Sequence, residues 1–490
     1  MASPDAVFTA ASLVAGLRAC ADPAAASRDA AALAALVARD EAAEAWLCEP
    51  AHARDAVHTL SCVLVSHSAQ LDTEALAGVC TTVSIALESA LDGDADDAVL
   101  QAACRGVCAA CRFSGRDALS AAAGLVALLA SVGTPATRDM LRAEAAPHVV
   151  AAMCLDAGVA DNSAACVALH YLTQDGAALV VARLPGVGAA LGAALSAAAE
   201  DEESGEAARA AAAALAHVAA DAQCAALLAP AAAGAVVALE THAANAGCVR
   251  WLAAAVAKLA DVGAAEARTP DACAAVARAL ALHRGVPALR APLLAALVAA
   301  AAAEEQAATL LMSGATAPFA LETRASGIAG AGSGLFVADG EVPAGAVVAL
   351  YPGEVWAHAP PASVAAGNEY LAASPGGGFA DGSPAAVARA AAAATARGAP
   401  ELGARAAAHM ANHPADGAAP NCFFLELALP HDALLRAPAA APDGGAPPWV
   451  LCLLAAQTLT SGEEVTVDYR IDAARAPSWF APVPDHLALL

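Results

Sequence analysis

The chain has 490 residues, about a third of them alanine, and its net charge is −25. A hydrophobic fraction of 59% is too high for an intrinsically disordered protein. Direct binding of nucleic acid is not expected, because contact with phosphates requires a basic face. The length predicts more than one domain, since a domain usually has about 100–200 residues.

The start of the chain and its apolar runs both predict an intracellular protein. Residues 1–5 do not begin a charged segment followed by an apolar core, so no secretory signal is expected. The run Leu293–Ala303 is too short to span a bilayer, and no membrane association is predicted. The 14 cysteines are therefore expected to be reduced thiols. No basic run indicates nuclear import, and the sequence does not determine whether the protein is nuclear or cytoplasmic.

The tightest cysteine cluster consists of Cys104, Cys108 and Cys111, which are four and three residues apart. This spacing places all three on one face of a helix. No histidine or further cysteine pair nearby completes a familiar zinc pattern. We expect the three side chains to pack in a core, because a free cysteine is a small apolar residue.

Residues 1–312 predict one helix after another, separated by short turns. One start is well marked at Thr269-Pro270, where threonine would cap the helix and proline would occupy its first turn.

Similar helices recur roughly 42–46 residues apart in this region, the spacing of armadillo and HEAT repeats. The pattern resembles an armadillo-like α-solenoid, with an irregular helical bundle as the alternative. A solenoid has a long concave face that usually binds protein partners.

A second domain is predicted over residues 313–480, with a C-terminal tail over 481–490. Glycine and proline become frequent here, and short runs of β-branched and aromatic residues appear. The segment from about 384 to 410 is rich in alanine and arginine, and we expect one or two helices inserted there. The expected strands are Gly334–Ala338, Ala346–Tyr351, Cys422–Leu429, Trp449–Leu454 and Glu464–Tyr469.

Three sequence blocks in this domain carry its candidate chemistry. The first contains Gly-Ala-Gly-Ser-Gly-Leu-Phe-Val at 330–337 and Tyr-Pro-Gly-Glu at 351–354. The second is His-Met-Ala-Asn-His at 409–413, followed by Pro-Asn-Cys at 420–422. The third is Gly-Glu-Glu-Val-Thr-Val-Asp-Tyr at 462–469. In this order and spacing, the blocks resemble the SET domain of S-adenosylmethionine-dependent protein methyltransferases.

Other interpretations of the blocks are less complete. A dinucleotide-binding loop needs a third glycine where residue 335 is leucine. His409 and His413 have the spacing of a helical metal pair, yet no third ligand is evident beside them. Asp468 and Tyr469 would otherwise end a strand with a packed aromatic ring.

The resemblance covers about a third of the chain and implies a mostly β, knotted fold of the β-clip type. It implies S-adenosylmethionine as cofactor and a lysine of a protein as methyl acceptor. In the family, the glycine-rich loop lies against the methionine part of the cofactor, where glycine allows a close backbone approach. The Asn-His pair meets the amino-acid and adenine portions. The implied cofactor-binding residues are Gly332, Ser333, Gly334, Leu335, Asn412 and His413.

The resemblance also implies the catalytic residue and the peptide groove. The hydroxyl of Tyr469 would orient the lysine amine and help to hold the sulfonium methyl group. Tyr351 is a second catalytic candidate, for which structural packing is an equal alternative. Tyr370 and Asp381 fall in the family's central strand pair and would line the groove, although a core position is equally open for Tyr370.

The sequence departs from the family pattern after the Asn-His pair. Pro414-Ala415 replaces the usual Ser-Cys, and the loop to Pro420 is three residues longer. The cysteine clusters that often flank family members do not follow Tyr469, so no zinc is expected. Trp479 or Phe480 would instead cap the adenine or close the lysine channel, with simple packing as the alternative.

The sequence thus predicts a protein-lysine methyltransferase whose helical repeats recruit a protein substrate or partner. Its acidity would suit a basic, lysine-bearing protein. The alternative is a non-catalytic scaffold with a degenerate SET domain. The altered loop favours that alternative, whereas the retained Tyr469 and glycine-rich loop oppose it.

Overall fold

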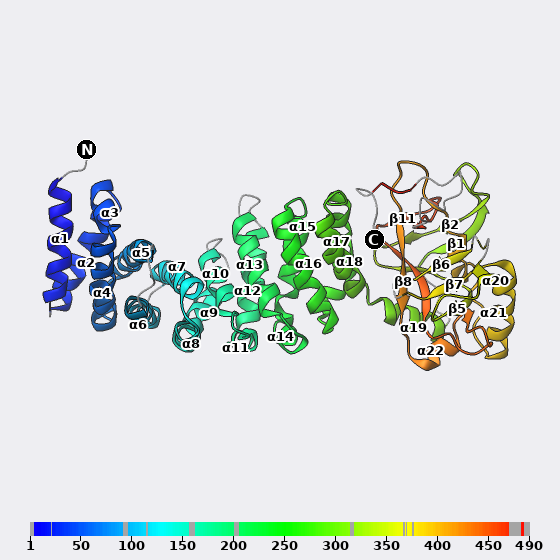
Figure 1. Ribbon diagram of the computed structural model, residues 1–490, viewed down its shortest axis with the longest axis horizontal. Coiled ribbons are helices and arrows are strands. Elements are labelled where there is room, and N and C mark those ends of the chain that lie inside the picture. The colour runs from blue at the N-terminus through cyan, green and yellow to red at the C-terminus, as the bar shows by residue number, and fades with distance from the viewer. Residues whose placement is uncertain are drawn as a thin grey trace. The chain divides into compact units, whose positions relative to one another are not determined.

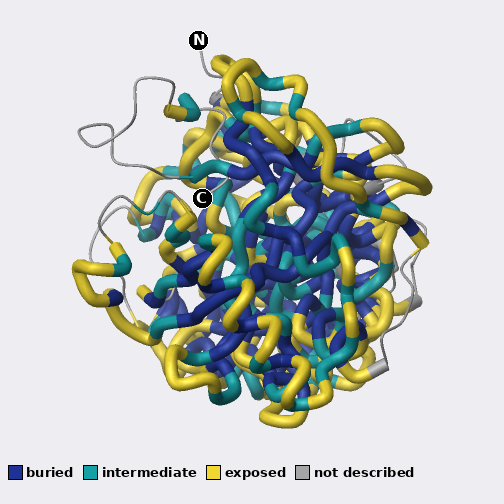
Figure 2. Tube along the Cα trace, turned by 90° about the vertical axis from the view of Figure 1, so that its right-hand side faces the viewer, coloured by how far each residue is buried: buried dark blue, intermediate teal, exposed yellow. Residues whose placement is uncertain are grey.

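The computed structural model describes residues 4–20, 22–91, 97–113, 116–155, 162–199, 205–313, 318–365, 368, 370–374, 377–469 and 482–484. The chain folds into an N-terminal unit, Met1–His242, and a C-terminal unit, Ala243–Leu490. Helices dominate up to about residue 310, and strands follow (Figure 1). Buried residues lie in the interior, and exposed residues surround them (Figure 2).

The described part of the N-terminal unit is helical, as its sequence predicts. Several helices begin at an acidic cap; the Asp72 carboxylate, for example, accepts a hydrogen bond from the Ala75 backbone N–H at 2.8 Å. The helices are α1 (Pro4–Ala19), α2 (Pro23–Val37), α3 (Glu41–Leu47), α4 (Pro50–His67), α5 (Thr73–Ala90), α6 (Asp97–Phe113), α7 (Arg116–Val132), α8 (Pro135–Glu144), α9 (Ala146–Leu155), α10 (Ser163–Leu172), α11 (Ala178–Ala182), α12 (Val187–Ala199), α13 (Gly205–Val218), α14 (Ala222–Leu227), η2 (Ala229–Ala231) and α15 (Ala232–Thr241).

Two rows of helices run through the N-terminal unit. In one row α2, α5, α7, α10 and α13 each pack on the next, and in the other α12 packs on both α9 and α15. Stacking of this kind covers the apolar face of each helix with its neighbour and so builds one continuous core. Cys104, Cys108 and Cys111 are buried on α6, which confirms the prediction that they pack in a core.

The C-terminal unit begins with helices α16 (Ala246–Asp261), η3 (Ala265–Arg268), α17 (Pro270–Leu282), α18 (Pro287–Ala301) and α19 (Ala303–Ser313). The predicted start of α17 is confirmed: Thr269 Oγ1 accepts a hydrogen bond from the Ala272 N–H at 3.1 Å. Among the described residues, one helical stretch, Pro287–Met312, is long and apolar enough to cross a membrane by length and composition alone. It is divided at Ala302, whose φ is 47°, and its α18 half packs on α16 and α17.

Four small sheets follow the helices. Their orders are β1-β2, β4-β10-β8, β11-β3 and β6-β7-β5-β9, and within them β5 and β9 pair in parallel. The strands are β1 (Ala320–Ala325), β2 (Ser333–Asp339), β3 (Glu341–Val342), β4 (Val347–Leu350), β5 (Gly353–Trp356), β6 (Leu371–Ala373), β7 (Phe379–Asp381), β8 (Cys422–Leu427), β9 (Ala439–Ala440), β10 (Val450–Ala455) and β11 (Leu459–Thr460). The first four expected strands therefore correspond to β2, β4, β8 and β10.

The fifth expected strand, Glu464–Tyr469, is wrong as a continuous strand. Only isolated bridges occur there, from Glu464 to Phe336, from Thr466 to Asn412 and from Val467 to Cys422. The cause is that this segment alternates between different partners on its two sides, so no single ladder extends along it.

The alanine-rich insertion forms α21 (Pro384–Ala396), capped by Ser383. Two 3₁₀ turns follow it, η4 (Gly403–Ala406) and η5 (Ala408–Met410). The short helices α20 (Ala362–Ala365) and α22 (His431–Leu435) flank the other strands.

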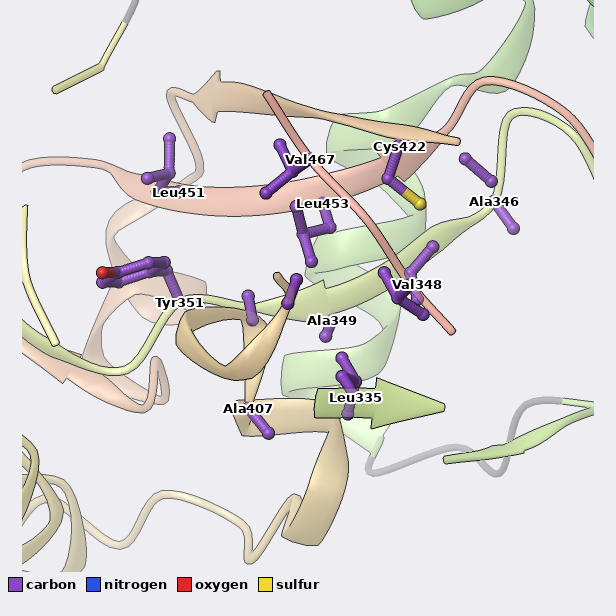
Figure 3. Close-up of a cluster of buried hydrophobic side chains, with 14 of the residues drawn as sticks. Leu335, Ala346, Val348, Ala349, Tyr351, Ala407, Cys422, Leu451, Leu453 and Val467 are labelled. Carbon is purple, nitrogen blue, oxygen red and sulfur yellow. The ribbon is translucent and has the colours of Figure 1, made fainter. Parts of the chain in front are cut away.

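The strands enclose one hydrophobic core. Figure 3 shows Leu335, Val348, Tyr351, Leu453 and Val467 converging from β2, from β4 and the residue after it, from β10 and from the segment 464–469. Each of these side chains is at most 4% exposed. The core therefore fixes the segments of all three candidate blocks against one another.

The last helices pack closely on the strands within the C-terminal unit. The Gln306 side chain donates to the Gly345 carbonyl at 3.0 Å and accepts from the Val347 N–H at 3.0 Å. Gly345 has a φ of 78°, and a Cβ there would lie 2.7 Å from Cys273 Sγ on α17 and 3.2 Å from Ala301 Cβ on α18. The close approach thus depends on a residue without a side chain.

Candidate functional site

The candidate site forms where the segment 464–469 lies between the two ends of the loop 413–420. On one side, the Val467 N–H donates to the Asn412 carbonyl at 2.9 Å. On the other side, the Cys422 N–H donates to the Thr466 carbonyl at 3.0 Å, and the Asn421 side chain donates to the Glu464 carbonyl at 2.8 Å. The second and third sequence blocks are therefore held together directly.

Asn412 is the most heavily engaged polar side chain at this crossing. It is 8% exposed, and its Nδ2 donates to the Ser333 carbonyl at 3.1 Å and to Glu464 Oε1 at 2.7 Å. The same carboxylate accepts from Ser326 Oγ at 2.6 Å and from the Gly327 N–H at 3.1 Å. These bonds link the first block to the other two.

The two glycines of the first block serve different steric purposes. Gly332 has a φ of 73° and no protein atom within 4 Å of the position of a Cβ, so its backbone conformation requires glycine. A Cβ at Gly334 would lie 2.8 Å from Asn412 Nδ2 and 3.0 Å from Glu464 Cδ. Space at Gly334 is thus taken by the protein's own side chains rather than left for a ligand.

The backbone groups predicted to meet a cofactor already have partners in the fold. The Ser333 carbonyl accepts from Asn412, and the Leu335 carbonyl accepts from the Val465 N–H at 2.8 Å. Leu335 itself is fully buried in β2.

Tyr469 reaches back to the second block. Its hydroxyl donates to the Ala411 carbonyl at 2.8 Å, and its backbone N–H donates to His413 Nδ1 at 3.3 Å. The His413 and Tyr469 rings lie 5.6 Å apart between centroids. His413 Nδ1 is also 3.8 Å from Asp468 Oδ1. Both Tyr469 and His413 therefore lie within the site, next to Asn412.

Tyr351 and Tyr370 belong to the same neighbourhood. The Tyr351 hydroxyl donates to the Tyr370 carbonyl at 2.7 Å, and its ring meets Phe424 edge to face at 5.8 Å. Tyr351 is 4% exposed, whereas Tyr370 is 43% exposed. The structure thus places Tyr351 in the core at the site and Tyr370 at the surface beside it. A core position for Tyr370, left open by the sequence, is excluded.

Burial controls the ionisation of the two inner phenols. Burial raises the pKa of Tyr469 to about 12 and raises the pKa of Tyr351 further, with a contribution from the nearby Tyr469. A raised folded-state pKa favours the neutral phenol, so the associated stability is present below pH ~10, the unfolded value, and is lost as the pH rises through the folded value.

We therefore expect tyrosinate absorbance to develop late when the folded protein is titrated with base. Tyr469→Phe should remove one phenol that ionises near pH 12 and should shift alkaline unfolding to higher pH. The measurement is absorbance near 295 nm combined with circular dichroism. Loss of absorbance near pH ~10, where an exposed phenol ionises, instead of near pH 12 would contradict the buried position of this phenol.

Asp381 is buried at the end of β7, and its carboxylate has partners within the protein. It accepts from Asn368 Nδ2 at 2.9 Å and from the Ser383 N–H at 2.9 Å. It therefore ties α21 to the segment before β6, as well as lying beside Tyr351. Asp381 and the residues after Tyr370 belong to a strand pair, β7 and β6, which runs antiparallel.

The other residues singled out from the sequence are the two histidines of the second block and the aromatic pair near the C-terminus. His409 lies on η5 and packs against Tyr351, whereas His413 lies outside any helix, so the two do not share a helical face as a metal pair would. Burial lowers the pKa of His409. Trp479 and Phe480 lie outside the described residues.

Sequence reasoning missed Glu464 and Ser326 as members of the site. Glu464 was visible in the Gly-Glu-Glu motif, but the motif does not reveal that its carboxylate faces Asn412. Ser326 had no motif signal. The distribution of tyrosine could have pointed to the site, because three of the four tyrosines in the chain, Tyr351, Tyr370 and Tyr469, lie together here.

Comparison of the chain with protein-family models found no matching model, and comparison with curated proteins found no matching protein.

Proposed function

We propose that the C-terminal unit is an S-adenosylmethionine-dependent methyltransferase acting on a lysine of a protein, and that its fold is of the SET type. The proposal rests on one observation: Asn412 and Tyr469 meet beside the glycine-rich loop, where 464–469 lies between 412 and 421–422. This brings the three blocks that resemble the SET domain to one place.

The polar groups present suit a cationic ligand such as S-adenosylmethionine. With Nδ2 of Asn412 directed at Ser333 and Glu464, its Oδ1 faces the opposite way, and no described residue donates a hydrogen bond to it. An amide oxygen accepts hydrogen bonds and therefore suits the ammonium group of such a ligand. When bound, the cofactor would supply a methyl group activated by positively charged sulfur.

The protein's own residues would prepare the acceptor. A lysine amine must lose its proton before it can accept a methyl group, and an apolar surrounding favours the neutral amine. Tyr351, Phe424 and Tyr469 provide aromatic surroundings of this kind. Because Tyr469 remains a neutral phenol at neutral pH, it acts by orienting the amine through its hydroxyl oxygen, and the amine proton passes to solvent.

The N-terminal unit would recruit the protein substrate or a partner protein, in the manner of an armadillo-like solenoid. Its stacked helices support this part of the proposal. The negative charge of the chain favours a basic partner.

Cofactor binding tests the proposal. We expect titration calorimetry to detect S-adenosylmethionine binding by the wild type and a loss of about tenfold or more for Asn412→Ala, because a hydrogen bond to a charged group is removed. Asn245→Ala, which removes only the cap of α16, is the control. Absence of binding by the wild type would instead favour a non-catalytic scaffold.

A further inference from the structure

We infer that Glu464 is a positioning residue that fixes the orientation of the Asn412 amide and holds the 326–334 loop against it. This inference deepens the proposed function, because it assigns a role at the same site to a residue that would not itself react. It rests on that function only where ligand binding is concerned. The contacts themselves are properties of the fold.

The first argument concerns the Asn412 amide. Its nitrogen faces two acceptors, the Ser333 carbonyl at 3.1 Å and Glu464 Oε1 at 2.7 Å. Rotating the amide by half a turn would place its oxygen against both acceptors and break both bonds. The bond to the carboxylate is charge-assisted and is the stronger of the two. Glu464 thereby determines that Oδ1, rather than Nδ2, is presented to a ligand.

The second argument concerns the loop. Glu464 accepts from Ser326 Oγ at 2.6 Å and from the Gly327 N–H at 3.1 Å, and Ser326 Oγ in turn accepts from the Ile328 N–H at 3.0 Å. Gly334, at the other end of the loop, leaves the room that this carboxylate occupies. The Glu464 carboxylate therefore hydrogen-bonds one end of the loop and fills the space that Gly334 leaves at the other end.

The third argument is that Glu464 is itself held in place. Its backbone carbonyl accepts from Asn421 Nδ2 at 2.8 Å, and it bridges to Phe336 of β2. A carboxylate anchored through its main chain can position its neighbours instead of following them. The adjacent Glu463 has a different role, since it accepts from Thr460 Oγ1 at 3.0 Å within its own turn.

Glu464→Gln is the sharpest variant, because it keeps the shape of the side chain and removes one acceptor. Oε1 serves Asn412 and Ser326, whereas Oε2 serves the Gly327 N–H. A glutamine has a single acceptor oxygen, so in either orientation it leaves Asn412 or Gly327 facing an N–H donor. Where the Gly327 bond is kept, its acceptor is no longer charged and the bond is weaker, so the loop is held less firmly in both orientations. Glu463→Gln is the matched control.

Hydrogen exchange of the ligand-free full chain gives a readout that does not depend on function. We expect faster exchange at Gly327 and Ile328 in Glu464→Gln and no change there in Glu463→Gln, with thermal unfolding measured to establish that both variants fold. Equal exchange at these amides in Glu464→Gln and wild type would overturn the inference.

Calorimetry with S-adenosylmethionine gives the second readout. We expect Glu464→Gln to bind about 10- to 100-fold more weakly than wild type, as for loss of a bond to a charged group. Combined with Asn412→Asp, which exchanges donor for acceptor, it should bind more tightly than the product of the two single effects predicts, because the glutamine amide donates to the new carboxylate.

The two readouts separate the inference from the proposed function. Two results with a wild type that binds S-adenosylmethionine would overturn the inference and leave the proposed function standing. One is that Glu464→Gln binds S-adenosylmethionine as tightly as the wild type. The other is that the loss of affinity in the double variant equals the product of the losses in the two single variants. If the wild type does not bind, the proposed function fails, and hydrogen exchange alone decides whether Glu464 positions the loop.

Discussion

Tyr469→Phe is expected to reduce methyl transfer by about 100-fold while leaving S-adenosylmethionine binding nearly unchanged. Only the hydroxyl is removed, and its proposed role is to orient the acceptor amine. The expected effect has the size seen when one preorganised hydrogen-bonding group is lost. Transfer would be measured with radiolabelled S-adenosylmethionine and a cell lysate as the source of protein substrate.

The variant also leaves the Ala411 carbonyl without its 2.8 Å bond, so a stability change of about 1 kcal/mol is expected alongside. Tyr171→Phe in the N-terminal unit controls for loss of a phenol elsewhere. Transfer by Tyr469→Phe at the wild-type rate would remove Tyr469 from the catalytic role. Loss of both binding and transfer would indicate that the hydroxyl supports the cofactor site through Ala411 and Asn412 instead.

Gly345→Ala is expected to destabilise the C-terminal unit strongly. A side chain there would adopt an unfavourable positive φ and would overlap Cys273 and Ala301. Left-handed backbone costs about 1–2 kcal/mol and overpacking a further 1–3 kcal/mol, so a loss of about 2–5 kcal/mol is expected. Chemical denaturation followed by circular dichroism measures it.

Gly398→Ala is the matched control for this prediction. Gly398 has a φ of 73°, but no protein atom lies within 4 Å of the position of its Cβ. Its substitution should cost the backbone strain alone. Equal destabilisation by the two substitutions would mean that α17 and α18 yield easily at Gly345, contrary to the tight packing of helices on strands.

The helices and strands were largely predictable because their signals are local. Thr269 caps α17 where a threonine before a proline predicts a cap, and Cys104 lies in the core where its helical spacing puts it. The segment 464–469 failed as a strand for a non-local reason. Its bridges go to three different parts of the chain, at Phe336, Asn412 and Cys422, and an apolar alternation cannot reveal that.

The sequence predicted which residues form the site better than it predicted the contacts between them. Tyr469, Asn412 and His413 do lie together, as their motifs suggested. The steric role of Gly334 differed from the expected one, because the space beside it is occupied by Asn412 and Glu464 and not left for a cofactor.

The start of the C-terminal unit also differs from the point where composition changes. Composition changes near residue 313, whereas the compact C-terminal unit begins at Ala243, because the last helices pack on the strands.

The sequence by itself determined the succession of helices, the position of most strands and the three blocks that suggest a methyltransferase. Only the tertiary structure decided that the Glu464 carboxylate joins Ser326, 138 residues away, to Asn412, 52 residues away. Residue periodicity depends on neighbours three or four positions apart, whereas these hydrogen bonds depend on the path that the whole chain takes through the core.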